Sequence, residues 1–346
     1  MEATTTVASR SPAQRKTRSS KLARNTSLLI AAVALLLLVA LLSLMTGAIS
    51  IPAHDVWTAL FHADDSEARQ IVWNLRLPRI LTGMLAGGCL AISGAFLQGI
   101  FRNPLADPGI IGVSAGGGLA AVVIMILYPA QIAFLPISAF GGAIVASAVV
   151  YLLAWRGGAS PLRLVLAGVA VNSLLGAAMT ALMIVNSEKV QSVLPWISGS
   201  LNGRSWPHFE TLLPYAIVGG IASLLLIKQA NLLVFGDDAA KLLGSRVEIG
   251  RLLIVAVSAF LAGAAISIVG MVGFVGLVMP HIIRMVSGSD YRILLPLSAI
   301  GGATLVIAAD TAARSWFDPI EFPVGILLAL IGAPFFLYLL RRGLAR

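Results

Sequence analysis

The run LLIAAVALLLLVALLSLM, residues Leu28–Met45, contains no charged residue and points to a bilayer as the environment of the chain. A helix needs about 20 consecutive apolar residues to cross the hydrocarbon core of a membrane. The run also exceeds the apolar region of a secretory signal peptide, which spans about 7–15 residues. Because many similar runs follow, we interpret it as the first of several membrane-spanning helices.

The composition of the whole chain supports the same environment. Of its 346 residues, 58% are hydrophobic and only 11% are charged, whereas a soluble domain carries about 25% charged residues. The mean hydropathy is +0.93. A surface this apolar could not stay in water, so the composition excludes a set of soluble domains.

The apolar runs predict an all-α membrane protein, a polytopic bundle of ten transmembrane helices. The eighth run is short and contains Pro280, which indicates a tilted or half-length helix packed inside the protein. Ten crossings place both termini on the same side of the membrane. The predicted helices lie near residues 28–46, 80–100, 110–127, 134–155, 162–185, 211–228, 251–272, 274–287, 293–312 and 322–340.

The basic residues indicate the orientation of this bundle. The net charge is +9, and with both termini inside, the inner segments hold three quarters of the 24 Lys and Arg residues. Cytoplasmic segments of membrane proteins are enriched in Lys and Arg, so both termini are expected in the cytoplasm. Residues 1–27, rich in Ser, Thr, Arg and Lys, are expected to form a disordered basic tail there.

A faint internal repeat relates helices 2–5 to helices 7–10. Leu85-Ala86-Gly87 with Gly94 recurs as Leu261-Ala262-Gly263 with Gly270. The copies lie five helices apart, so one is inverted relative to the other, which is typical of transporters. Chance recurrence of these common residues is the alternative.

Few residues offer bond-making chemistry. Cys89 is the single cysteine, the four histidines lack metal-ligand spacing, and the chain lacks a phosphate-binding loop. We therefore expect no metal site, no cofactor and no ATP hydrolysis by this chain. Gly112–Gly116 matches the G-x-S-x-G motif of hydrolases around Ser114, but its place at the start of a membrane helix favours close helix packing.

The predicted helix interiors also lack paired carboxylates. Ion-coupled transporters and pumps usually carry such groups at membrane depth. The acid closest to a helix body is Asp310, near the outer end of the ninth helix. This pattern argues against an ion-coupled secondary transporter, and it implies that another protein supplies the energy.

The inner segment 229–250 predicts a docking surface. Asp237 is a good helix N-cap and Gly244 is a natural helix stop, so a two-turn helix with an apolar edge is expected between them. An exposed apolar edge on the cytoplasmic side suits a soluble partner. A helix resting on lipid headgroups is the alternative.

The outer segment Arg76-Leu77-Pro78-Arg79 predicts a second docking surface. Proline suits the first helical position, which would place Arg79 in a first turn, where the helix dipole disfavours a cation. A partner that bears carboxylates would explain the arginines, and interfacial snorkelling is the alternative. Arg314 could instead pair with Asp310, four residues earlier.

Several longer segments together resemble a known family. The chain is similar to the FecCD-like permeases, the membrane subunits of binding-protein-dependent ABC importers for iron–siderophore complexes, haem and cobalamin. The similarity covers nearly all of residues 28–342, which are expected to form one permease domain of the type II importer class. It is carried by RLPR (76–79), NPLADPG (103–109), GSLNG (199–203), GFVGLVMPH (273–281) and PVGI (323–326).

The resemblance implies partners and roles for particular residues. Two permease copies, or this chain and a similar one, would form a dimer with the path between them, and a substrate-binding protein would dock outside on Arg76, Arg79 and Arg314. An inner gate would lie in the loops after helices two and four, at Asn103, Leu105 and Ser160. Two separate ATPase subunits would dock on the coupling loop 229–250, through Phe235, Gly236, Asp237, Ala240, Leu243 and Gly244.

The sequence thus predicts a permease subunit of an ABC importer in a bacterial cytoplasmic membrane. A ferric siderophore is the expected cargo, with haem or cobalamin as the alternative and ion-coupled transport as a remote one. The chain itself would position and gate the cargo and would not be an enzyme.

Overall fold

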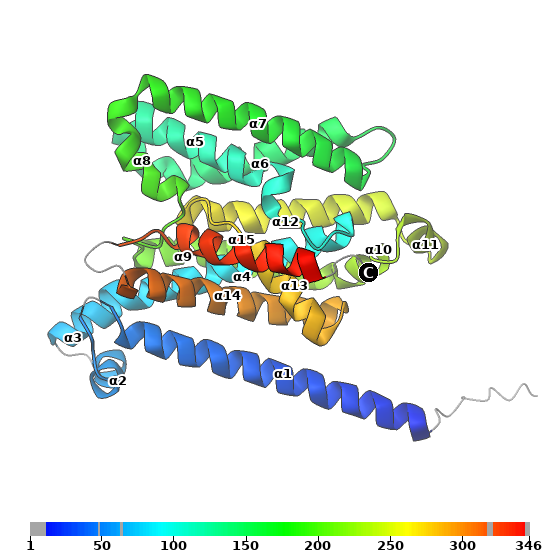
Figure 1. Ribbon diagram of the computed structural model, residues 1–346, viewed down its shortest axis with the longest axis horizontal. Coiled ribbons are helices and arrows are strands. Elements are labelled where there is room, and N and C mark those ends of the chain that lie inside the picture. The colour runs from blue at the N-terminus through cyan, green and yellow to red at the C-terminus, as the bar shows by residue number, and fades with distance from the viewer. Residues whose placement is uncertain (1–11, 48, 63–64, 317–320, 343–346) are drawn as a thin grey trace, which may run out of the picture.

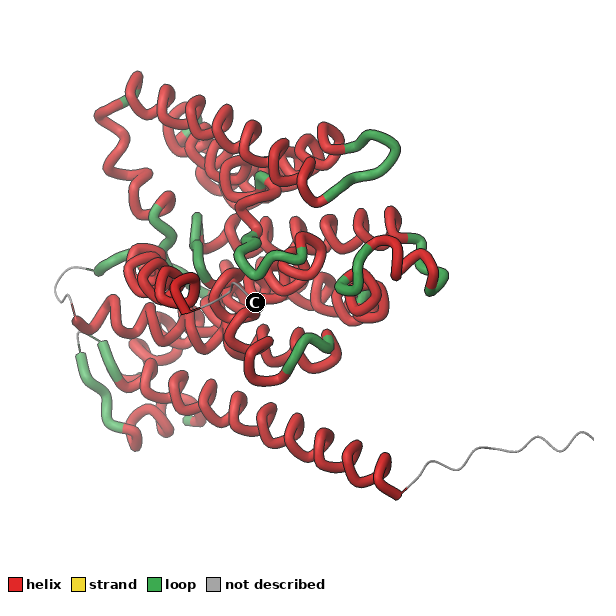
Figure 2. Tube along the Cα trace, turned by 45° about the vertical axis from the view of Figure 1, so that its right-hand side comes forward, coloured by secondary structure: helices red, strands yellow, loops and turns green. Residues whose placement is uncertain are grey.

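The computed structural model describes residues 12–47, 49–62, 65–316 and 321–342, and in these ranges every regular element is a helix (Figures 1 and 2). The elements in chain order are α1 (Pro12–Met45), α2 (Ala53–Phe61), α3 (Glu67–Arg69), the π-helix η1 (Gln70–Arg76), α4 (Leu77–Phe101), η2 (Pro108–Ile111), α5 (Val113–Leu127), η3 (Pro129–Phe134), α6 (Leu135–Ala154), α7 (Pro161–Val185), η4 (Ser187–Lys189), α8 (Val190–Ile197), α9 (Trp206–Leu225), α10 (Ile227–Leu233), α11 (Asp237–Leu242), α12 (Val247–Val269), α13 (Val275–Ser287), α14 (Tyr291–Trp316) and α15 (Val324–Arg342).

The all-α membrane fold that the sequence predicts is confirmed. Among the described residues, seven helical stretches are long and apolar enough to cross a membrane, and three shorter apolar helices accompany them. The three shorter ones are α5, α13 and the apolar part of α15. Each of the ten predicted segments therefore forms a helix, and a count of ten crossings stays a prediction.

Helices α4 and α12 form the centre of the bundle. In the apolar stretches that contain them, 78% and 72% of the residues are buried, against 11% for α1 and for α7. Helix α4 packs against both α12 and α14, and α5 packs against α6. A helix that is buried on all sides belongs to the interior, so α1 and α7 are left on the outside of this chain (Figure 1).

Glycines allow the backbones of the central helices to touch. A Cβ atom added at Gly94 in α4 would collide with the carbonyl group of Gly276 in α13. The same holds between Gly87 in α4 and Gly302 in α14. Small residues permit this close approach, because lipid-embedded helices associate mainly through van der Waals packing.

The packing also follows the predicted repeat. Helix α4 packs against α14 as α12 packs against α6, and α5 packs against α6 as α13 packs against α14. These pairings correspond if α4–α7 and α12–α15 are the two copies. The arrangement supports an inverted repeat over chance recurrence of Leu-Ala-Gly.

Two helix boundaries differ from the expectation. Helix α1 begins at Pro12, so residues 12–27 extend this helix instead of forming a disordered tail, and residues 1–11 lie outside the described ranges. The alanines, lysines and arginines before Leu28 are good helix formers, and they continue a helix that the bilayer already stabilises.

The second difference concerns Pro78, which does not begin a helix. Residues Glu67–Phe101 form one continuous helical stretch of 35 residues. Its turn before Pro78 is π-helical, and the Leu77 N–H donates to the Val72 carbonyl five residues earlier. Proline lacks an N–H and crowds the preceding turn, so a wider turn accommodates it. Arg79 is therefore near the start of α4 but well inside the continuous stretch that begins at Glu67, so the helix-dipole argument for it is wrong.

Candidate functional site

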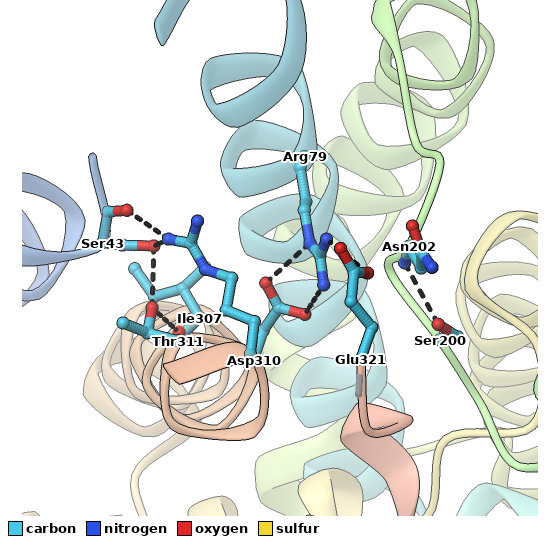
Figure 3. A network of polar contacts seen from close by, with 9 residues as sticks. Ser43, Arg79, Ser200, Asn202, Ile307, Asp310, Thr311 and Glu321 are labelled. Carbon is cyan, nitrogen blue, oxygen red and sulfur yellow. Dashed lines mark hydrogen bonds and ion pairs between the residues drawn. The ribbon is translucent and has the colours of Figure 1, made fainter. Parts of the chain in front are cut away.

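An ion pair between α4 and α14 organises one end of the bundle. Arg79 donates from Nε and Nη2 to the two carboxylate oxygens of Asp310, each at 2.9 Å (Figure 3). Its Nη1 donates to Glu321 Oε2 at 3.2 Å. Arg79 and Asp310 are both largely buried, whereas Glu321 is partly exposed. Two parallel hydrogen bonds of this kind fix the geometry as well as the charge.

The other two predicted arginines close the end of α1. Arg76 is buried and donates from Nη1 to the Leu44 carbonyl at 2.6 Å and from Nη2 to the Ile49 carbonyl. Arg314 donates to the Ser43 carbonyl and to Ser43 Oγ, the latter at 2.9 Å. The last carbonyls of a helix lack partners within it and favour cations. The expected pairing of Arg314 with Asp310 is therefore wrong, because Arg79 occupies that carboxylate.

All three predicted docking arginines thus gather at one end of the molecule. A Cβ atom at Gly47 would lie 2.9 Å from Arg76 Nη2 and 3.2 Å from Arg314 Nη1, so both guanidinium groups flank this residue. Asp310, bound to Arg79, lies one turn before Arg314 in α14. We call Arg76, Arg79, Arg314, Asp310 and Glu321 the arginine cluster. In this structure each arginine binds groups of its own chain.

Arg204 is a fourth cation at this end that the sequence reasoning missed. It lies in the loop between α8 and α9, and its Nη1 is 3.3 Å from His208 Nε2. Burial, and secondarily the positive charge of Arg79, lower the pKa of Arg204. The signal was available, because Arg204 directly follows the segment 199–203 that carried the family resemblance.

Helix α11 presents an apolar edge at the other end of the bundle. Gly236 is its N-cap, so Asp237 is the first helical residue and not the cap that we expected. Gly236, at φ +99°, has the freedom to make this turn, and Gly244, at φ +77°, ends the helix as predicted. Phe235, Leu242 and Leu243 are exposed, Leu242 at 89%. We call these three side chains the apolar patch.

A buried arginine behind α11 ties this helix to α12. Arg251 in α12 is 2% exposed, and its Nη2 donates to Asp237 Oδ1 at 2.6 Å. Its Nη1 donates to the Ala159 carbonyl and lies 3.5 Å from Glu248 Oε1. Glu248 in turn accepts from the Ala159 N–H at 3.0 Å, and Arg102 Nη2 lies 3.9 Å from Asp237 Oδ1. We call these groups the Arg251 node.

The Arg251 node reaches the two loops in which a gate was predicted. Ala159 directly precedes Ser160, whose hydroxyl accepts from Arg163 Nε at 3.0 Å at the start of α7. Arg102 directly precedes Asn103, whose side-chain oxygen accepts from the Leu105 N–H at 2.9 Å. Asp237, one of the predicted coupling residues, and both loops in which a gate was predicted therefore meet in one place.

These two regions lie at opposite ends of the molecule. Figure 1 shows α2 and α3 at one end and α10 and α11 at the other, with α4 running between them. Helix α4 carries Arg79 near its start and Arg102 just after its end. Its 25 residues span about 37 Å, the thickness of a membrane.

The hydrolase alternative gains no support from the surroundings of Ser114. Ser114 lies in the first turn of α5, and Gly116 packs against Gly142 of α6, as close helix packing predicts. In the described ranges, no group of three or more His, Cys, Asp or Glu residues could hold a metal ion.

A many-helix membrane bundle with separate polar sites at its two ends is compatible with a transport permease. The chain belongs to the FecCD transport family, whose model matches residues 35–342. It is accordingly a multi-pass membrane protein and a permease subunit of an ABC importer, in a family that serves iron–siderophore complexes, haem and cobalamin.

The relatives span several cargoes. The chain is 41% identical over 302 residues to the Fe(3+)-citrate import system permease protein YfmD of Bacillus subtilis, which covers 87% of this chain and 90% of the relative. It is 40% identical to the hemin transport system permease protein HmuU of Yersinia pestis, with 89% and 93% covered. It is 44% identical over 275 residues to the cobalamin import system permease protein BtuC of Halobacterium salinarum, with 79% and 74% covered.

A solved structure shares the fold. It is described as an inward-facing conformation of a metal-chelate type ABC transporter, with a TM-score of 0.79 and 32% sequence identity. The match covers 92% of this chain and 99% of that chain.

Proposed function

We propose that this chain imports a ferric siderophore across a bacterial cytoplasmic membrane, with both termini in the cytoplasm and ATP hydrolysis on separate partner subunits. The observation that carries the proposal is the pair of sites at opposite ends of α4. One end gathers arginines, and the other joins an exposed apolar patch to two loops through the Arg251 node.

On the outer side, we assign the arginine cluster to a substrate-binding protein that presents carboxylates. Arg79 already holds Glu321, which is partly exposed, at 3.2 Å. An incoming carboxylate could take the place of Glu321 without disturbing the buried pair with Asp310. Arg76 and Arg314 would add positive charge that steers the binding protein to this end.

On the inner side, we assign the apolar patch to two ATPase subunits. A movement of α11 would pull on Asp237, and Arg251 would transmit it to the loops at Asn103–Leu105 and Ser160. Two permease copies, or this chain and a similar one, would enclose the path. Transport then alternates between outward-open and inward-open states driven by ATP.

The cargo assignment is tested by uptake into proteoliposomes that contain the complete importer. Labelled ferric siderophore, haem and cobalamin are offered in parallel, each with the binding protein and ATP. We expect ATP-dependent uptake of a ferric siderophore. Uptake of haem or cobalamin alone would transfer the assignment to that cargo. Uptake without ATP would contradict an ABC importer and favour an ion-coupled secondary transporter.

A further inference from the structure

A cavity of about 650 Å³ lies next to the arginine cluster. Its walls come from the end of α5, η3, α8, the loop that carries Arg204, α12, and the starts of α6 and α9. Ligand sites for small molecules have volumes of about 300–1,000 Å³, so a compact metal chelate could enter. The lining combines apolar side chains such as Trp196 and Met125 with the polar side chains of Ser192, Ser200, Asn202 and Ser267.

The charge of this cavity is positive. Arg204 and His208 are the ionisable residues of its described lining, which contains no carboxylate. The Nε atom of Arg204 is buried and lacks a hydrogen-bond partner among the described residues. A buried donor of a cation without a partner is costly, and a ligand that accepts a hydrogen bond would remove the cost.

His208 lies against Arg204 without neutralising it. The Ser205 N–H donates to His208 Nδ1 at 3.3 Å in the capping box of α9, and Ser205 Oγ lies 3.1 Å from the same nitrogen, so Nδ1 is the acceptor of the ring. The proton of the neutral ring is then on Nε2, which lies 3.3 Å from Arg204 Nη1 and offers it no acceptor. The contact is therefore between a cation and a neutral ring, and the positive charge stays available.

Two other buried arginines near the ends of the bundle are compensated by carboxylates. Arg79 binds Asp310 and Glu321, and Arg251 binds Asp237 and Glu248. Arg76 and Arg314 donate to backbone carbonyls instead, and neither of them lines the cavity. For Arg204, no ion pair with a carboxylate exists in the described part of the chain, and Arg79 adds repulsion. An arginine is kept uncompensated in a cavity most simply where an anion visits it.

We propose that Arg204 recognises an anionic cargo, a ferric chelate that carries free carboxylates, as it passes through this cavity. The inference rests on the proposed function and narrows its substrate class. A guanidinium group binds carboxylates through two parallel hydrogen bonds, so Arg204 would favour such chelates over neutral ferric trihydroxamates. The hydroxyl and amide groups that also line the cavity would hydrogen-bond the remaining oxygens.

The test compares an anionic with a neutral probe in the reconstituted importer. Ferric citrate and a neutral ferric trihydroxamate are offered to the wild type and to Arg204→Gln, Arg204→Lys and Asn202→Asp. Arg69→Gln is the matched control, because it removes a cation in α3 that does not line the cavity. Binding-protein docking is measured separately for every variant.

We expect Arg204→Gln to lower uptake of ferric citrate about 10-fold, which corresponds to about 1.4 kcal/mol. Arg204→Lys should retain most uptake, Asn202→Asp should lower it, and docking and the control should not change. Equal loss for both probes, loss of docking, or unchanged uptake would overturn the inference. Haem also carries carboxylates, so haem uptake that depends on Arg204 would replace the siderophore assignment but keep the anionic one, and transport of cobalamin alone would overturn both.

Discussion

The arginines at the ends of this bundle illustrate how a membrane protein buries charge. Arg79 shares two hydrogen bonds with Asp310, whereas Arg76 and Arg314 use the final carbonyls of α1. The buried pair keeps its charges because each compensates the other, and the removal of one leaves the other unpaired. The contributions of Arg79 and Asp310 to stability are therefore expected to depend on each other.

A double-mutant cycle measures this dependence. Arg79→Ala and Asp310→Ala should each destabilise the protein by about 3–5 kcal/mol, because each leaves an uncompensated charge. The double variant should cost clearly less than the sum of the two. Thermal unfolding in detergent checks the expectation, and strictly additive losses would contradict the buried pair.

Asp107 gives a pH-dependent prediction outside the membrane-spanning segments. Its Oδ1 accepts from the Gly109 N–H at 2.8 Å at the start of η2, and burial raises the pKa of this carboxyl despite that hydrogen bond. The folded chain then binds the proton more tightly than the unfolded chain. The contribution of Asp107 to stability falls as the pH rises from its unfolded pKa, about 4, through its higher folded pKa.

Asp107→Asn keeps the cap but removes the charge. We expect the melting temperature of this variant to fall less than that of the wild type as the pH rises across that window. Asp107→Ala serves as the comparison, since it lacks both the charge and the cap and should be less stable than Asp107→Asn by about 1 kcal/mol at every pH. An identical pH profile for Asn and the wild type would show that Asp107 does not titrate in this way.

At the scale of elements, the Arg251 node predicts how α11 communicates with the gate loops. Asp237→Asn removes the charge of the acceptor in its shortest contact, the 2.6 Å bond, and Arg251→Gln removes the guanidinium donor. We expect cargo uptake per ATP hydrolysed to fall at least about 5-fold, since coupling between sites is typically worth 1–3 kcal/mol. The exposed neighbour Asp238→Asn is the control and should behave as wild type. An unchanged ratio of uptake to ATP hydrolysis in Arg251→Gln would show that the Arg251 node does not transmit movement from α11 to the gate loops.

The backbone contacts between helices give a second prediction at this scale. Gly94→Ala should destabilise the bundle by about 1–3 kcal/mol, because the new methyl group would force α4 away from Gly276 of α13. At Gly176 in α7, nothing lies within 4 Å of the added Cβ position. Gly176→Ala should therefore be neutral or stabilise by about 0.5–1 kcal/mol. Thermal unfolding of both variants compares the two positions.

The proposed topology of the whole molecule places Asn202 outside the cell and Leu242 and the N-terminus in the cytoplasm. Cys89 is buried, so the natural chain offers a nearly unreactive background for cysteine labelling. An impermeant maleimide added outside intact cells should modify Asn202→Cys but not Leu242→Cys. An N-terminal tag should resist protease from outside. Labelling of Leu242→Cys from outside would invert the proposed orientation.

The sequence predicts the helices of this fold well, because apolar runs and the glycine motifs act locally. It predicts the partners of single charged residues poorly. Arg79 and Asp310 are 231 residues apart, and Arg314 finds Ser43 across 271 residues. Charge and local spacing drew attention to Arg76 and Arg79, and the family resemblance added Arg314, for which spacing alone offered the wrong partner, Asp310. The π-helical turn before Pro78 escaped notice for a similar reason, since tertiary packing holds the helix together there.

The link between α1 and Arg314 also has a consequence for biogenesis. Helix α1 leaves the ribosome long before α14, since the guanidinium group that binds Ser43 is made 271 residues later. At about 5–20 residues per second, this interval lasts on the order of tens of seconds. During it α1 must persist in lipid without α14, which its charge-free run Leu28–Met45 permits. The hydrogen bonds between Arg314 and Ser43 of α1 can therefore form only after the last third of the chain has been made.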